Sequence, residues 1–169
     1  MASTTDTTKT HAPRNLQEEI GKKQPFDDIR EEVMLSLVRT TDQFTSQFKQ
    51  LFGQHGLSDS SYNVLRIVAA RGKQGIPSQS ISKDMVHRDP DVTRLIDRLV
   101  KLGFVERQRC EQDRRVVHVI ITDQGSQTLK TLKSPVKKLH EQQLGHLSDA
   151  KLRKLAKLLF EARHPTSGG

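Results

Sequence analysis

The fold is decided by the stretch PDVTRLIDRLVKLG, residues 90–103, and by FVERQRCEQDRRVVHVII, residues 104–121, which follows it directly. Apolar side chains recur at helical spacing in the first segment, which predicts a helix with one buried face. Pro90 suits the first turn of this helix, and Gly103 suits a left-handed cap at its end. The residues expected on the buried face are Val92, Leu95, Ile96 and Leu99.

The second segment predicts a two-stranded β-hairpin. Residues 104–107 and 116–121 have strand-like patterns, and the later run consists almost entirely of β-branched side chains. The loop between the two strands, residues 108–114, is long and charged, so we expect it to project into solvent.

Helices are predicted on both sides of this pair. Before it, a long helix covers about residues 26–53, and a second helix begins after Ser58, whose hydroxyl is a natural N-cap. A short third helix starts at Pro77-Ser78 and ends in a turn at residues 87–89.

After the hairpin, Thr122 is the natural cap of a fifth helix, and Ser148 caps a sixth. Pro135 lies inside the fifth helix and is expected to kink or split it near residues 131–135.

A short helix, a tight turn, a second helix and a hairpin together form a winged helix-turn-helix. We therefore expect a mainly α protein with a two-stranded β wing, in which the N- and C-terminal helices form a dimerisation domain. The expected organisation is a mobile tail at 1–24, a domain at 25–163 and a loose C-terminus at 164–169. Within the domain, the dimerisation helices cover about 26–53 and 123–162, and the winged helix covers about 57–121.

Composition limits the classes of function. The chain has 169 residues, a formal net charge of +8 and a pI near 9.8, which favours a polyanionic partner. A single cysteine excludes an intramolecular disulfide and a cysteine-rich zinc site. The sequence has no apolar run long enough to span a membrane and no apolar signal core, so we expect a cytoplasmic protein with no membrane partner.

Two groups of side chains are candidates for binding double-stranded DNA. One is the exposed face of the predicted helix, where Asp91 either caps the helix or tunes specificity. The other is the tip of the hairpin. The candidates on the helix are Pro90, Asp91, Thr93, Arg94 and Arg98, and those on the hairpin are Arg109, Asp113, Arg114 and Arg115.

In this order and spacing, the segments 92–99, 103–107, 113–115 and 121–125 resemble the multiple-antibiotic-resistance regulator (MarR) family. The resemblance covers roughly residues 30 to 160. It implies a homodimeric transcription factor, in most cases a repressor of a pseudo-palindromic operator that a small ligand releases. It also implies that Arg94 reads a base, and that Arg115 enters the minor groove, oriented by a salt bridge with Asp113. One departure is Lys151, where the family often has an acidic residue.

The resemblance further implies a small aromatic or anionic effector. Tyr62 and Arg66 lie one helical turn apart and suit a ligand with a carboxylate; the alternative is a core tyrosine beside a surface arginine. Cys110 lies among cations, so it is either a redox-responsive thiol or an inert one. Asp84, His87 and His118 are too sparse to predict a metal site, and no cofactor is expected.

Two other classes of function are an enzyme and a sequence-neutral nucleic-acid-binding protein. The sequence has no phosphate loop, no zinc-protease motif and no nucleophile beside a base, so we do not expect an enzyme. A sequence-neutral nucleic-acid-binding or architectural protein is the main alternative. Residues 130–157 hold eight Lys or Arg against two Asp or Glu, whereas residues 87–118 hold eight against six. The excess charge is therefore either a solvated face or an additional contact to phosphates.

Overall fold

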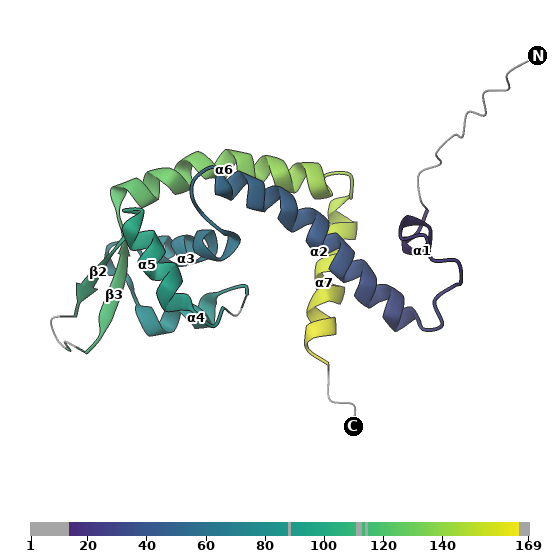
Figure 1. Ribbon diagram of the computed structural model, residues 1–169, viewed down its shortest axis with the longest axis horizontal. Coiled ribbons are helices and arrows are strands. Elements are labelled where there is room, and N and C mark those ends of the chain that lie inside the picture. Colours follow the sequence, from purple (N-terminus) through teal and green to yellow (C-terminus); the bar gives the residue numbers. More distant parts are fainter. Residues whose placement is uncertain (1–13, 88, 111–112, 114, 166–169) are drawn as a thin grey trace, which may run out of the picture. The chain divides into compact units, whose positions relative to one another are not determined.

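A computed structural model describes residues 14–87, 89–110, 113 and 115–165 of the chain (Figure 1). The chain divides into two compact units, residues 1–44 and residues 45–169. The long helix α2, Ile29–Gly53, contributes to both units.

In the described part of the first unit, a short helix, α1, precedes α2. α1 covers Leu16–Glu19 and begins at Asn15, whose side chain accepts a hydrogen bond from the backbone N–H of Glu18. An ion pair between Glu19 and Arg39, with an N–O distance of 2.8 Å, joins α1 to α2. This helix lies within residues 1–24, which the sequence predicts as a mobile tail. The expectation of a mobile tail at residues 1–13, and part of the expected loose C-terminus, fall outside the described residues.

The second unit contains the predicted winged helix-turn-helix. Its helices are α3 (Asp59–Ala70), α4 (Ile81–Asp84) and α5 (Val92–Lys101), and two 3-10 turns lie between α3 and α4 at Gly72–Gln74 and Ser78–Ser80. The Ser58 hydroxyl accepts from the backbone N–H of Ser61 at 3.1 Å, which confirms the predicted cap of α3.

The sheet has three strands, not the two that the sequence predicts for the wing. The expected strands are β2 (Val105–Arg109) and β3 (Val117–Ile121), and the third is β1, Ile76–Pro77. All pairs are antiparallel in the order β1-β3-β2, with Ile76 opposite Val119 and Arg107 opposite Val119 on the other side. A strand of two residues, one of them proline, has no alternating pattern that a sequence could show.

Gly75 brings β1 against β3. Its φ is +63°, and an added Cβ would lie 2.6 Å from the carbonyl oxygen of Val119. Only glycine combines this left-handed conformation with so close a backbone approach.

Two helices follow the sheet: α6 (Asp123–Leu144) and α7 (Asp149–Arg163). The predicted caps are confirmed, because Thr122 accepts from the N–H of Gly125 and Ser148 from that of Lys151. Of the kink and the split predicted at Pro135, the split is wrong, since α6 runs through the proline without a break. Leu132 and Val136 on either side of it are buried, so packing outweighs the missing hydrogen bond.

The core lies between α3, α5, α6 and the sheet, where apolar side chains from each element are buried. No helix within the described residues is long and apolar enough to cross a membrane. Fully or almost fully buried members of this core are Val64, Leu65, Val68, Ile96, Leu99, Val105, Val119 and Leu132.

Candidate nucleic-acid interface

Asp91 caps α5. Its carboxylate accepts from the backbone N–H of Arg94 at 3.0 Å, and its own N–H donates to the Asp89 carboxylate at 3.0 Å. Of the two roles considered for Asp91, the geometry therefore shows capping. The two carboxylates fix the point at which the chain leaves the turn after α4 and enters α5.

The two faces of α5 differ sharply in exposure. Ile96 and Leu99 are 2% and 0% exposed in the core, whereas Thr93 and Arg94 are exposed at the N-terminal end. Pro90 is exposed as well, but the prediction that it lies in the first turn is wrong, because it precedes the cap Asp91. A helix that enters the major groove reads base edges with residues near its N-terminus. Thr93 and Arg94 lie at that end of α5, and their contact with bases stays a prediction.

Two polar residues of α5 are held by the protein itself. The guanidinium of Arg98 donates to the carbonyl oxygen of Gly56 at 2.8 Å. Asp97 forms an ion pair with Arg107 of β2. These contacts attach α5 to the loop before α3 and to strand β2 of the wing.

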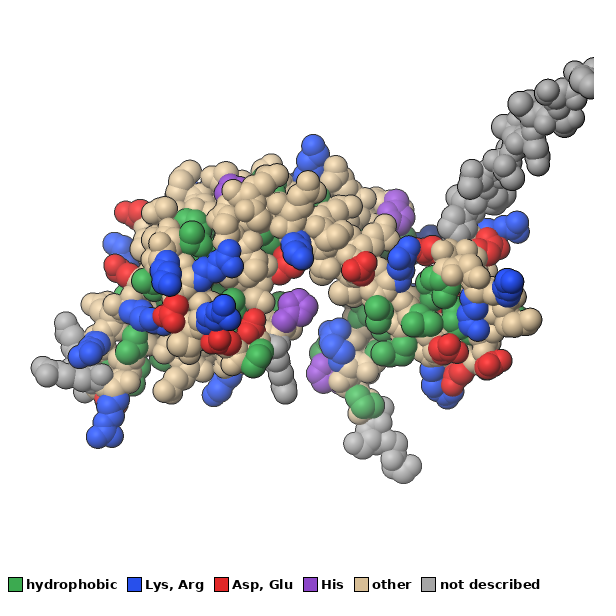
Figure 2. Space-filling view, in the orientation of Figure 1, with side chains coloured by type: hydrophobic (Ala, Val, Ile, Leu, Met, Phe, Trp, Pro, Cys, Tyr) green, Lys and Arg blue, Asp and Glu red, His purple; other side chains and the backbone are tan. Residues whose placement is uncertain are grey.

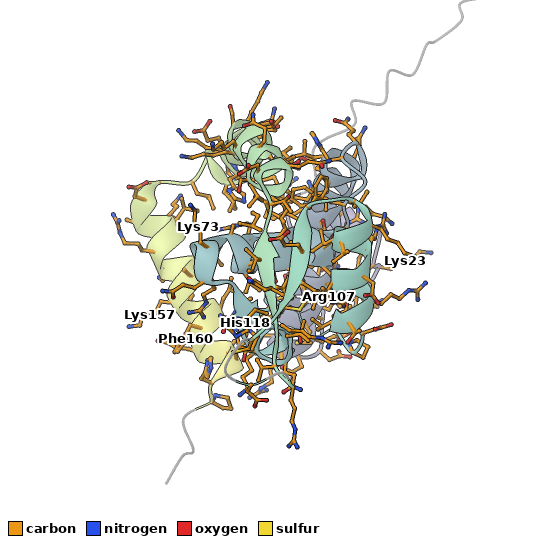
Figure 3. All side chains as sticks on the ribbon, turned by 90° about the vertical axis from the view of Figure 1, so that its left-hand side faces the viewer. Lys23, Lys73, Arg107, His118, Lys157 and Phe160 are labelled. Atoms are coloured by element: carbon orange, nitrogen blue, oxygen red, sulfur yellow. The ribbon has the colours of Figure 1, made fainter. Side chains whose placement is uncertain are left out.

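The wing presents exposed basic side chains at the end of β2 and in the loop that follows it. Figure 3 looks toward the wing and labels Arg107 on β2 and His118 on β3. Arg109 and Arg115 are exposed, while Arg114 lies outside the described residues. Asp113 accepts from the backbone N–H of Arg115 at 2.9 Å. No ion pair between these two described side chains occurs in the structure, and the salt bridge that the resemblance implies stays a prediction.

Cys110 lies at the end of β2, half-buried. Its backbone N–H donates to the carbonyl oxygen of Val116 at 2.9 Å, which closes the base of the hairpin loop. Its redox role stays a prediction.

Acidic side chains are mixed with basic ones over the visible face of the winged helix (Figure 2). This face is therefore not a uniform cationic patch. Binding by charge alone would favour such a patch, whereas base reading needs only a few well-placed groups.

Tyr62 and Arg66 line a cleft of about 550 Å³ between α3 and α6. The Tyr62 ring stacks on Phe52 with a centroid distance of 4.1 Å, and the Arg66 guanidinium lies 6.0 Å from the Tyr62 centroid. Tyr62 is half-buried and packs against the core, Arg66 is exposed, and both line the cleft, so the effector role of this pair stays a prediction. The other lining residues are Ala69, Ala70, Leu129, Lys130, Lys133, Val136, Lys137 and His140.

The basic residues of α6 in this cleft were missed as site residues, although their spacing carries a signal. Lys130, Lys133, Lys137 and His140 recur every three or four residues and therefore share one helix face. That this face turns toward Arg66 depends on the packing of α6 against α3. No group of three or more side chains suited to a metal ion occurs in the described part of the chain.

Residues 46–132 match the family described as transcriptional regulator SarA/Rot. Among curated proteins, the HTH-type transcriptional regulator PapX of Escherichia coli is 27% identical over 104 residues, 61% of this chain. The chain spans 63% of the length of PapX.

Solved structures share the fold over most of the chain. A MarR transcription factor from Planctomyces limnophilus is 40% identical, with a TM-score of 0.63 and coverage of 80% of this chain and 98% of that one. Bordetella bronchiseptica BpsR, whose DNA binding is regulated by 6-hydroxynicotinic acid, is 20% identical, with a TM-score of 0.72. The alignment with BpsR covers 85% of this chain and 100% of BpsR, and at this identity it shows the fold alone.

Proposed function

Because this chain belongs to the MarR family of winged-helix transcriptional regulators, we propose that it binds a specific DNA operator and controls transcription there. The proposed active form is a homodimer on a pseudo-palindromic site. The proposed mode is repression, which a small aromatic or anionic effector relieves. The observation that carries the proposal is the exposed N-terminal end of α5, with Thr93 and Arg94, beside a wing with exposed arginines.

On DNA, α5 enters the major groove and Arg94 pairs with a guanine. An arginine fork matches the O6 and N7 acceptors of guanine, which is the commonest specific contact in such complexes. Arg109 and Arg115 of the wing reach the adjacent minor groove and its phosphates. A narrow minor groove attracts arginine through its enhanced negative potential.

Exposed apolar side chains in both units support the homodimer. In α2, Val33, Met34 and Val38 are 49%, 61% and 61% exposed, and no residue of α7 is buried. Amphipathic helices gain stability chiefly by burying their apolar face, and a second copy of the chain supplies the missing surface. A two-fold dimer then sets its recognition helices about 34 Å apart, in successive major grooves.

The cleft between α3 and α6 supports control by an effector. Tyr62 offers a ring for stacking and Arg66 a fork for an anionic group. α3 packs against α5, and α6 continues from β3 through Thr122. A ligand held between α3 and α6 therefore contacts the helix that packs against α5 and the helix that follows the wing. α5 and the wing are the two elements that we propose bind DNA. Regulation of BpsR by an aromatic acid agrees with this proposal.

The experiment that tests the proposal compares binding of the full chain to DNA upstream of its own coding region and to a random duplex, at two salt concentrations. A preference of roughly a thousandfold that survives the higher salt supports a specific regulator. A symmetric footprint supports the dimer. Genome-wide selection of bound fragments covers operators that lie elsewhere.

The main alternative is sequence-neutral binding, and the same data separate the two. Equal affinity for all fragments, falling steeply with salt, would assign the protein to that class. A reporter driven by the selected promoter then distinguishes repression from activation by the sign of the change when the protein is removed.

A further inference from the structure

We propose that the cleft between α3 and α6 is selective for a ligand that carries phosphate as well as an apolar or planar part. Arg66, Lys130 and Lys133 bind the phosphate in this assignment, and Tyr62 packs on the apolar part. The inference rests on the proposed effector role of the cleft and names the chemical class of the effector.

The charge of the cleft exceeds what one carboxylate needs. Four of its ten lining residues are Lys or Arg, and none is Asp or Glu. A single arginine fork already satisfies a carboxylate. Three further cations on the same walls repel one another unless the ligand brings more than one negative charge, and a phosphate monoester does so in one compact group.

Among the described side chains, only one of these four cations has an ion-pair partner. Lys137 pairs with Glu141 across one helical turn at 3.5 Å. No ion pair of Arg66, Lys130 or Lys133 occurs among the described side chains. Lysine binds phosphate as a point charge with rotatable donors, which suits a tetrahedral group better than a flat one.

The shape of the cleft fits a ligand with two chemically different ends. Its volume of about 550 Å³ lies within the range of roughly 300–1,000 Å³ that is usual for organic ligands of drug size. Lys130 to Lys137 form a basic row of about 10 Å along α6, given a rise of 1.5 Å per residue. The apolar lining comes from Ala69, Ala70, Leu129 and Val136.

The other side of α6 lacks this concentration of charge. A second groove there is lined by Lys138 together with four glutamines and three other uncharged residues. The lining glutamines are Gln47, Gln50, Gln54 and Gln142. Basic side chains therefore gather on the cleft side of the helix, and Lys138 provides a control of the same residue type on the same element.

The test uses two probes with the same ring, benzoate and phenyl phosphate, titrated into the full chain and followed by two-dimensional NMR. We expect phenyl phosphate to bind about tenfold more tightly than benzoate and to shift signals of the cleft residues. The double variant Lys130→Gln/Lys133→Gln should abolish this preference, while Lys138→Gln should retain it. Unchanged thermal unfolding of both variants shows that they are folded.

Equal affinity for the two probes, or a preference that persists in the double variant, would overturn the assignment. DNA backbone is the other source of phosphate, so operator affinity is measured in parallel without probe. If the double variant loses operator affinity and the salt dependence of operator binding, while Lys138→Gln keeps both, Lys130 and Lys133 bind DNA. That result would reject a small-molecule role. If neither probe shifts the cleft signals while operator binding is intact, the cleft proposal fails and the DNA-binding regulator stands.

Discussion

At the scale of single residues, the charged side chains around α5 divide into two groups. Asp91, Asp97, Arg98 and Arg107 make contacts within the protein. The guanidinium of Arg94 makes no hydrogen bond or ion pair with any described residue, although the Arg94 backbone is held by Asp91. An exposed fork on a fixed backbone is preorganised for a base edge, since binding then orders only one side chain.

Replacing Arg94 by alanine should lower operator affinity by about 1–3 kcal/mol and relax the preference for one base pair. The matched control is Arg94→Lys, which keeps the charge but loses the bidentate fork. Fluorescence anisotropy on the operator and on its single-base variants measures both effects. An equal loss of affinity on operator and random DNA would assign Arg94 to phosphate contact instead.

Asp59, in the first turn of α3, gives a prediction on pH. Burial raises the pKa of its carboxyl above the ordinary 3.8, although His87 and Lys49 oppose the shift. One of its oxygens has no hydrogen-bond partner among the described residues. A raised pKa means that the folded state binds the proton more tightly than the unfolded state, so this group costs stability as pH rises above 3.8.

Asp59→Asn should therefore raise the melting temperature near neutral pH, and the gain should shrink as pH falls toward the ordinary carboxyl range. Thermal unfolding from pH 3.5 to pH 7.5 tests this. A variant that is less stable than the wild type at neutral pH would show that attraction to the start of α3 outweighs burial.

At the scale of elements, the start of α6 is tied to the end of α5. The Thr122 hydroxyl donates to the carbonyl oxygen of Gly103 at 2.6 Å. The backbone N–H of Thr122 donates to the carbonyl oxygen of Phe104 at 3.1 Å. Gly125 in the first turn of α6 lies directly against the Phe104 backbone. The wing therefore begins and ends at one junction, which restricts how the hairpin can move relative to α5.

Gly125→Ala should destabilise the protein by about 1–3 kcal/mol, because the added methyl group would overlap the carbonyl oxygen of Phe104. Gly53→Ala is the matched control, since an added Cβ there meets nothing within 4 Å. Urea unfolding monitored by circular dichroism measures both. Equal stability of the two variants would mean that α6 shifts away from this junction at little cost.

At the scale of the whole molecule, much of the apolar surface of α2 and α7 is uncovered in a single chain. Leu155, Leu158 and Phe160 of α7 are 41%, 52% and 57% exposed. Figure 3 labels Phe160 and Lys157, which lie on the same helix and are both exposed. Leu155 and Leu158 are three positions apart and therefore lie together on one face of α7, which is typical of an element that packs against a partner.

The double variant Leu155→Glu/Leu158→Glu should shift the protein from dimer to monomer and weaken operator binding, because one winged helix then holds only a half-site. Arg153→Glu introduces the same side chain on the opposite face of α7 and should leave the dimer intact. Sedimentation velocity across a concentration series gives the measurement. A monomeric wild type, or a double variant that remains dimeric, would contradict the proposed role of α7.

The amino-acid sequence determined those features that depend on neighbours along the chain. The caps at Ser58, Asp91, Thr122 and Ser148, the buried stripe of α5 and the strands of the wing all follow from local spacing and local hydrogen bonds. The candidate DNA-contacting residues of α5 also follow from local spacing, since helical periodicity already places Arg94 on a different face from Ile96 and Leu99.

Only the tertiary structure decided features that join distant segments. The pairing of β1 with β3, the continuity of α6 through Pro135 and the hydrogen bond from Arg98 to Gly56 each depend on packing between separate elements. The same holds for the cleft, where Arg66 of α3 faces lysines more than sixty positions further along the chain. Local propensity sets where a helix begins and which face is apolar, but the direction in which its polar face points is set by the elements that bury the other side.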